Sequence, residues 1–290
     1  MLSVEDLRKE YRGVVAVEGS TFAVDDGEVF GLVGPNGAGK TTTLKMVAGL
    51  VEPTAGTATV AGRDAADPEM RRSLGFLPEE SPLYEEMSAV SYLSFFADLY
   101  DVPGDVAERR IHGALDDLEL DARERPIGDM SKGMKRKVAI ARSLVNDPEV
   151  LVYDEPASGL DPLTTNYVLE FVRDLAAEGR TVLFSAHNLY HVEDVCDRVA
   201  IMRDGEVIAC GSLPEVRDAH GTTEYRVFTT VEVEGAVREN GSYKRVVPDM
   251  AAVERVRDAA RENGGEVVDI RTVEASLEDI FLDLAGGAGA

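Results

Sequence analysis

The segment Gly34-Pro35-Asn36-Gly37-Ala38-Gly39-Lys40-Thr41 decides the fold that we expect for this chain. It fits the pattern GxxxxGK followed by Ser or Thr, and it comes directly after the apolar run at residues 29–33. Glycines in such a loop allow the backbone to wrap a phosphate with its N–H groups pointing inward, and the helix that follows adds the positive end of its dipole. Lys40 would then reach the β- and γ-phosphates of a nucleotide, and the Thr41 hydroxyl would bind Mg²⁺.

Two more apolar runs resemble the one before this loop, because each is short and ends in polar side chains. Residues 150–153 precede Asp154 and Glu155, and residues 181–185 precede His187. Short apolar runs of this kind are typical of strands buried on both faces of a sheet. Strand and helix patterns alternate along the chain, which predicts an α/β fold with a largely parallel sheet.

The polar ends of these strands are the candidate catalytic residues. Ligands of doubly wound sheets bind at the carboxyl ends of the strands, so we expect these ends to converge on one pocket. There Asp154 would organise Mg²⁺, Glu155 would act as a base on the attacking water, and His187 would bond a γ-phosphate oxygen. Taken alone, an Asp-Glu pair or a single His is usually structural. The phosphate loop is what favours the catalytic interpretation.

A helix is predicted to start near Ser131. Met134, Val138, Ala141 and Val145 follow at spacings of four, three and four, which gives the helix one apolar side. We expect the Ser131 hydroxyl to cap the helix. The same N–H groups and dipole can also hold an anion. Because the glycine loop already cradles one nucleotide, that anion would belong to the site of another molecule.

The composition limits the partners. Acidic residues number 54 and basic residues 30, a formal net charge of −24, which argues against nucleic acid as a partner. The two cysteines form no metal-binding pattern, and no apolar run approaches the roughly 18 residues of a membrane span. The charged N-terminus predicts no secretory leader. If the protein works at a membrane, another molecule must hold it there.

In their order, these motifs resemble those of the nucleotide-binding subunits of ABC transporters, over residues 1 to about 218. Residues 34–42 resemble the Walker A loop, 150–155 the Walker B strand, 158–161 the D-loop and His187 the switch histidine. Residues 131–134 resemble the family signature, usually Ser-Gly-Gly-Gln. Tyr11 stands where the family has an aromatic residue that stacks on adenine.

The resemblance implies a fold and a set of site residues. The fold is a P-loop NTPase core at residues 1–218, with an inserted helical subdomain at about 83–146 and a small α+β accessory lobe at 219–290. The cofactors are ATP and Mg²⁺. The implied nucleotide-binding residues are Tyr11, Gly34, Pro35, Asn36, Gly37, Ala38, Gly39, Lys40, Thr41 and Thr42. The implied Mg²⁺ ligands are Thr41, Glu79 and Asp154, and the implied catalytic residues are Lys40, Glu155 and His187, with Ser131 and Gly133 of the opposite subunit.

The resemblance also implies partners. In the family two cassettes, as a homodimer or a pair of related subunits, sandwich two ATP molecules and drive a polytopic membrane permease from the cytoplasmic face. Residues 276–281 resemble the ending of subunits from exporters with separately encoded membrane proteins. The aromatic residues between 83 and 100 either pack the helical subdomain or line a groove for a permease helix. The transported substrate is not encoded here, because specificity lies in the permease.

The chain departs from the family pattern at three positions. Glu79 stands where the family usually has glutamine, and Lys132 and Met134 replace the usual Gly and Gln of the signature. We expect the sandwich to form, with an altered rate of hydrolysis. One alternative is a soluble ABC ATPase of translation or DNA repair, although those resemble tandem cassettes or carry coiled coils. Another is a P-loop kinase or GTPase, although the chain lacks an NKxD guanine motif.

Overall fold

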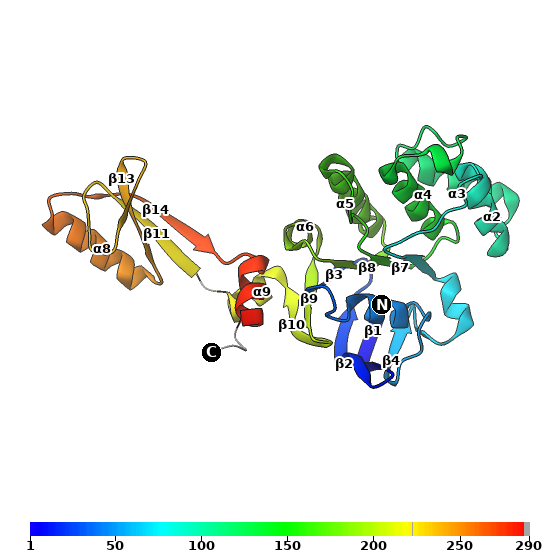
Figure 1. Ribbon diagram of the computed structural model, residues 1–290, viewed down its shortest axis with the longest axis horizontal. Coiled ribbons are helices and arrows are strands. Elements are labelled where there is room, and N and C mark those ends of the chain that lie inside the picture. The colour runs from blue at the N-terminus through cyan, green and yellow to red at the C-terminus, as the bar shows by residue number, and fades with distance from the viewer. Residues whose placement is uncertain (222, 287–290) are drawn as a thin grey trace. The chain divides into compact units, whose positions relative to one another are not determined.

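The computed structural model describes residues 1–221 and 223–286 (Figure 1). The chain forms two compact units, residues 1–212 and residues 213 onward. Over the described residues, no helix combines the length and the apolar character that crossing a membrane requires.

The first unit is built on a six-stranded sheet in the order β10-β9-β3-β8-β7-β6. Its strands are β3 (Val29–Val33), β6 (Leu74–Leu77), β7 (Val150–Asp154), β8 (Thr181–Ala186), β9 (Arg198–Arg203) and β10 (Glu206–Ser212). All neighbours pair in parallel except β9 and β10, which form the hairpin that Asp204-Gly205 closes. The predicted α/β fold with a mostly parallel sheet is confirmed.

Helices and a second sheet bury both faces of this sheet. Every residue of β3, β7 and β8 is buried, which is why their sequences are nearly continuous apolar runs. In Figure 1, α5 (Pro162–Ala177) and α6 (Leu189–Val195) lie above the sheet. The helix α1 (Lys40–Val47) shares a core with the sheet through Leu44 and Leu32.

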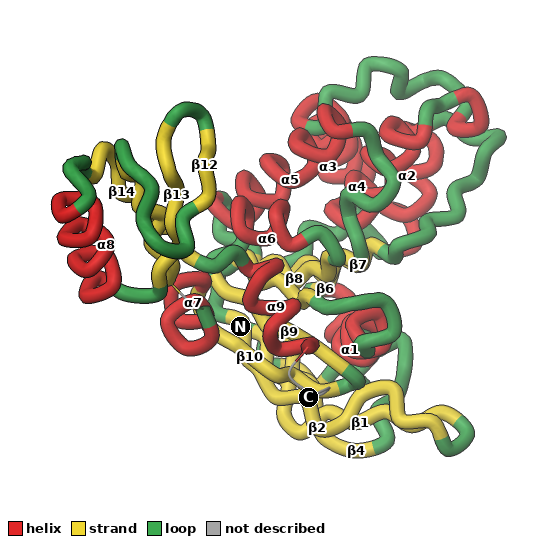
Figure 2. The backbone as a smooth tube through the Cα atoms, turned by 60° about the vertical axis from the view of Figure 1, so that its left-hand side comes forward, coloured by secondary structure: helices red, strands yellow, loops and turns green. Residues whose placement is uncertain are grey.

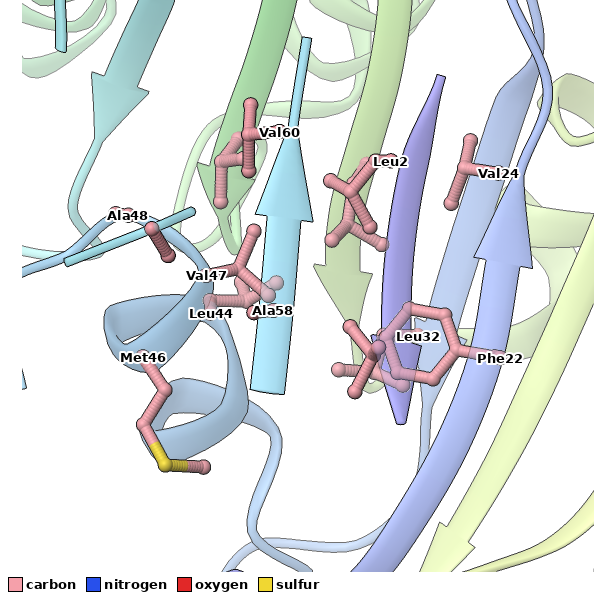
Figure 3. Packing of buried hydrophobic residues seen from close by; sticks show 14 of the residues in the cluster. Leu2, Phe22, Val24, Leu32, Leu44, Met46, Val47, Ala48, Ala58 and Val60 are labelled. Carbon is pink, nitrogen blue, oxygen red and sulfur yellow. The ribbon is translucent and has the colours of Figure 1, made fainter. Parts of the chain in front are cut away.

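The second sheet is antiparallel, in the order β2-β1-β4-β5, and the sequence analysis did not anticipate it. Its strands are β1 (Leu2–Tyr11), β2 (Val14–Val24), β4 (Ala55–Val60) and β5 (Arg63–Asp64). Irregular register between β1 and β2, with a left-handed backbone at Asp6, interrupts the alternation that would have marked these strands. Figure 3 shows side chains of this sheet and of α1 meeting Leu32 of β3 in one core.

Residues 83–146 form the predicted helical segment. It contains α2 (Ala89–Leu99), α3 (Gly104–Asp117) and α4 (Lys132–Leu144), which contact one another and stand out as red helices in Figure 2. Ser88 caps α2 and Ser131 caps α4, each by accepting a bond from a backbone N–H three residues on. A short 3₁₀ turn at Ile127–Asp129 lies between α3 and α4, and another at Pro68–Arg72 lies between β5 and β6.

The second unit is a small α+β lobe. It contains α7 (Leu213–His220), β11 (Thr223–Thr229), β12 (Val237–Glu239), β13 (Ser242–Val247), α8 (Met250–Glu262), β14 (Val267–Glu274) and α9 (Leu277–Gly286). The antiparallel sheet runs β12-β13-β11-β14, and α8 covers one face through Val253 and Val256. The unit begins at residue 213, not 219, because α7 starts directly after β10 and contacts α9. The glycine- and alanine-rich sequence of residues 286–290 predicts a frayed end, and residues 287–290 lie outside the described residues.

Candidate functional site

The loop between β3 and α1 has a backbone that only glycine adopts easily. Gly37 and Gly39 have φ values of +85° and +101°. A Cβ added to Gly39 would lie 2.6 Å from the Ala16 carbonyl oxygen, so neighbouring backbone fixes the loop from outside. This close approach leaves the N–H groups at the start of α1 free to face a phosphate.

Lys40 opens α1 and folds back over the loop. Its Nζ donates to the carbonyl oxygens of Gly34, at 2.7 Å, and Pro35, at 3.1 Å. Burial lowers the pKa of the Lys40 ammonium, and the nearby carboxylates of Glu155 and Asp154 oppose that shift. The loop therefore holds a buried cation whose present partners are neutral carbonyls, which an anionic phosphate would outcompete.

The carboxyl ends of β7 and β8 are tied together by one buried serine. Ser185 Oγ donates to Asp154 Oδ1 at 2.6 Å and accepts from the Glu155 backbone N–H at 3.0 Å. Directly after Asp154 the chain leaves the sheet, with Glu155 at a left-handed φ of +48°. Ser185 was not among the residues predicted for the site. The available signal was a polar residue inside an otherwise apolar buried strand.

Glu155 and His187 form a hydrogen-bonded pair. His187 Nδ1 lies 2.7 Å from Glu155 Oε2. Burial raises the pKa of Glu155, and the hydrogen bond and charge of His187 oppose the rise. A carboxylate with a raised pKa, oriented by an imidazole, is the arrangement of a general base and its positioning partner.

These elements surround one cavity of about 440 Å³, which we call the phosphate-loop cavity. It is lined by Ala16, Asn36, Gly37, Ala38, Gly39, Lys40, Thr41, Thr42, Glu79, Glu155, Ser158 and His187. The strand ends thus converge as expected. Gly34 and Pro35 contact the site through their carbonyl oxygens, which accept hydrogen bonds from Lys40. The buried Asp154 carboxylate accepts a hydrogen bond from Ser185.

Three of the expected site residues lie elsewhere. Of the residues described, Ala16 rather than Tyr11 lines the cavity beside the loop. Tyr11 is exposed at the end of β1, with Lys9 Nζ 5.1 Å from its ring centre. Ser131 and Gly133 belong to the start of α4, where the Ser131 hydroxyl is the cap and a Cβ on Gly133 would meet the Thr164 side chain. Neither lines the phosphate-loop cavity.

The oxygen donors around the cavity fit Mg²⁺ bound together with a nucleotide. Thr41 and Glu79 line the cavity, and a hydroxyl and carboxylates are the hard ligands that this ion prefers. Over the described part of the chain, no three His, Cys, Asp or Glu side chains form a cluster that could hold a metal. An ion here would need oxygens from the nucleotide as well, which is how proteins usually bind Mg²⁺.

Comparison with known proteins places this geometry in a family. The family model described as "ABC transporter" matches residues 17–158. A Nostoc sp. protein named as an ABC transporter ATP-binding protein is 34% identical, covering 98% of this chain and 89% of the relative. This chain belongs to the ABC transporter ATP-binding family. The family and fold predictions are confirmed, and the chain is an ABC ATPase that binds and hydrolyses ATP for transport.

Further relatives of this ABC ATPase agree. A fluoroquinolones export ATP-binding protein of Mycobacterium tuberculosis is 36% identical, covering 93% of this chain and 88% of its own. A solved ATP-binding subunit of an ABC transporter superposes with a TM-score of 0.70 at 36% identity, covering 76% of this chain and 92% of that one. A bacterial ABC transporter cassette solved as a dimer gives 0.68 at 25% identity, covering 73% and 99%.

Proposed function

We propose that this ABC ATPase drives an exporter whose polytopic membrane permease is a separate chain, and that it works as a dimer closed around ATP. The observation that carries the proposal is the separation of two anion-binding features. Lys40 and Glu155 line the phosphate-loop cavity, whereas Ser131 and Gly133 start a different helix. A second cassette, identical or related, would bring its Ser131 to this cavity. The solved dimeric cassette and the relative named for export support this proposal.

In the proposed reaction, water attacks the γ-phosphorus of ATP and the bond to the β-phosphate oxygen breaks. Glu155 orients the water and accepts its proton, while His187 holds the carboxylate in place. Lys40 and the loop N–H groups stabilise charge on the phosphate oxygens, joined by Ser131 and Gly133 of the opposite cassette. Mg²⁺, when held by Thr41, Glu79 and Asp154, neutralises phosphate charge. Hydrolysis then lets the dimer reopen.

The adenine would extend from the loop toward β1 and β2. Ala16 lines the cavity on this side and offers a small apolar contact. Tyr11 is exposed at the end of β1 and is free to stack on the base when nucleotide binds. Because a stacked ring would be shielded, binding should cover a side chain that is now 45% exposed.

The proposed permease surface is the exposed part of the aromatic segment. Tyr92 is buried, and its ring contacts Phe96 in the core of the helical segment. Tyr84 and Phe95 are 56% and 43% exposed, and their rings contact each other. We assign the buried rings to packing and the exposed pair to a cytoplasmic helix of the permease. This contact would hold the ATPase at the inner face of the membrane.

Three variants test the proposal. Glu155→Gln should bind ATP without hydrolysing it and elute as a dimer in size-exclusion chromatography with light scattering. Lys40→Ala should lose ATP binding and stay monomeric. Tyr84→Ala should keep the ATP-dependent dimer and lose co-purification with the permease. A Glu155→Gln protein that stays monomeric with ATP would reject the sandwich, and co-purification with ribosomes or DNA would favour the soluble ATPase instead.

A further inference from the structure

Arg136 of α4 is a buried charged residue with an unusual set of partners. Its side chain is 8% exposed and bonds backbone carbonyl oxygens of two separate segments. Nε donates to Pro156 at 2.7 Å, Nη1 to Pro78 at 2.9 Å and Glu79 at 3.0 Å, and Nη2 to Asp154 at 3.1 Å and Glu155 at 2.6 Å. A guanidinium has five N–H donors in a rigid plane, and here each carbonyl takes up one of them.

Both segments carry a residue that lines the phosphate-loop cavity. One carries Glu79, and the other is the turn that carries Glu155 out of β7. Lysine has no planar fork and presents its three donors from a single nitrogen, so it could not span both segments in this way. Burial lowers the pKa of Arg136 to about 10, so the guanidinium remains charged at neutral pH.

The turn at Glu155 needs contacts from outside the turn to stabilise its backbone. The left-handed φ of +48° at Glu155 is unfavourable for any residue other than glycine. The carbonyls on both sides of this residue, and its own, point at Arg136. The guanidinium therefore satisfies carbonyls that the strained turn withdraws from the sheet. The Glu155 carboxylate reaches His187 from that turn.

We infer that Arg136 is a positioning residue for ATP hydrolysis. Its guanidinium fixes the main chain at Glu79 and Glu155 and joins both to α4, the helix that Ser131 caps. The inference rests on the proposed role of Glu155 as the base. Arg136 itself does not line the phosphate-loop cavity. It sets where the base and the Glu79 loop stand, so its loss changes the chemical step more than ATP binding.

The chain provides a matched control on the same helix. Arg142 also joins α4 to the sheet, through Nη2 to the Phe76 carbonyl at 3.3 Å and Nη1 to Tyr92 Oη at 3.4 Å. Neither partner belongs to the lining of the phosphate-loop cavity. Arg142→Lys removes a comparable link between α4 and β6 and leaves the Glu155 turn untouched.

The test compares Arg136→Lys and Arg142→Lys in the full chain, by kcat and KM for ATP hydrolysis, Kd for ATP and the thermal midpoint. We expect Arg136→Lys to lower kcat at least tenfold, with KM and Kd within threefold of wild type. Arg142→Lys should lower the thermal midpoint and keep kcat within twofold. An unchanged kcat in folded Arg136→Lys, or an equal loss in both variants, overturns the inference.

A measurement on the wild-type protein covers the case in which Arg136→Lys does not fold. The Ser158 amide donates to the Glu155 carbonyl across the same turn. If Arg136 holds this turn, the Ser158 amide should exchange with solvent deuterium as slowly as the β7 amides. Fast exchange overturns the inference. Glu155→Gln, measured in parallel, separates the two proposals. If this variant hydrolyses ATP at the wild-type rate, the role of Glu155 as the base is rejected, whatever the result for Arg136→Lys.

Discussion

His187 Nδ1 lies 2.7 Å from Glu155 Oε2 and joins the ends of two neighbouring parallel strands. The register pairs Asp154 of β7 with Ser185 of β8, so both residues of the pair follow just beyond the last matched position. The imidazole is 57% exposed, whereas the carboxylate is 11% exposed. A solvent-facing His187 therefore orients an enclosed carboxylate, and both side chains line the phosphate-loop cavity.

The first prediction concerns the pH dependence of hydrolysis. A base works deprotonated, so activity rises with pH as Glu155 loses its proton. Burial raises the pKa of Glu155 and His187 lowers it. His187→Ala should therefore raise the pKa of Glu155 further and move the acidic limb of the pH–rate profile to higher pH. Because His187 positions the base and does not itself take the proton, we also expect kcat to fall by up to roughly 10²-fold, the low end of what a general base contributes. The measurement is single-turnover hydrolysis as a function of pH.

The matched control for this prediction is His191→Ala. His191 lies one turn further on, in α6, where its ring contacts Tyr190. Its removal should leave the acidic limb in place. A limb that stays in place after His187→Ala would show that His187 does not tune Glu155.

The sequence predicts the core of the site well, because three of its strands can be recognised from local sequence patterns. Each is a short apolar run that ends in Gly34, Asp154 or His187, and parallel strands bring such ends together. The Ser131 cap was predictable for a similar reason, since a hydroxyl before an apolar helical stripe is a local signal. In these cases the residues next to each site residue in the sequence are enough to predict its local structure.

The features that escaped prediction depend on contacts between distant segments. Arg136 looks ordinary in its helix, and the polar Ser185 in an apolar strand does not by itself reveal a partner; only the fold brings them to the carbonyls and carboxylate that they bind. Ala16 lines the cavity because β2 passes over the loop, in a sheet whose irregular alternation hid it. The position of Tyr11 came from family resemblance alone, and in this structure its side chain lies outside the cavity lining.

The second prediction concerns the carboxylate that replaces the usual glutamine. Glu79 lines the cavity with Thr41 and adds negative charge near Lys40. Glu79→Gln should raise the Mg²⁺ concentration for half-maximal hydrolysis roughly fivefold, equivalent to about 1 kcal/mol. Titrating Mg²⁺ at saturating ATP measures this. Glu80→Gln, at the exposed next position, is the control, and equal Mg²⁺ requirements in both variants would exclude Glu79 as a ligand.

The third prediction compares two glycines of the phosphate loop. Gly37→Ala strains the backbone at φ +85° by about 1–2 kcal/mol but meets nothing within 4 Å. Gly39→Ala has similar strain and also pushes against the Ala16 carbonyl. We expect ATP affinity to fall at least tenfold more for Gly39→Ala, as measured by isothermal titration. Equal affinities would mean that Ala16 yields without disturbing the loop.

The last prediction separates a serine that serves the site from one that serves the core. Ser185→Ala leaves an Asp154 carboxylate oxygen and the Glu155 N–H without their buried partner, which should cost about 1–3 kcal/mol in the free energy of unfolding. Ser143→Ala removes the 2.8 Å contact with the Tyr153 hydroxyl, at a cost of about 1 kcal/mol. Both should lower the urea midpoint. Only Ser185→Ala should lower kcat, by at least tenfold, because of these two serines only Ser185 contacts both acidic residues. If the two variants lose stability and keep kcat alike, Ser185 acts as packing between strands, and the position of Glu155 depends on its contacts with Arg136 and His187.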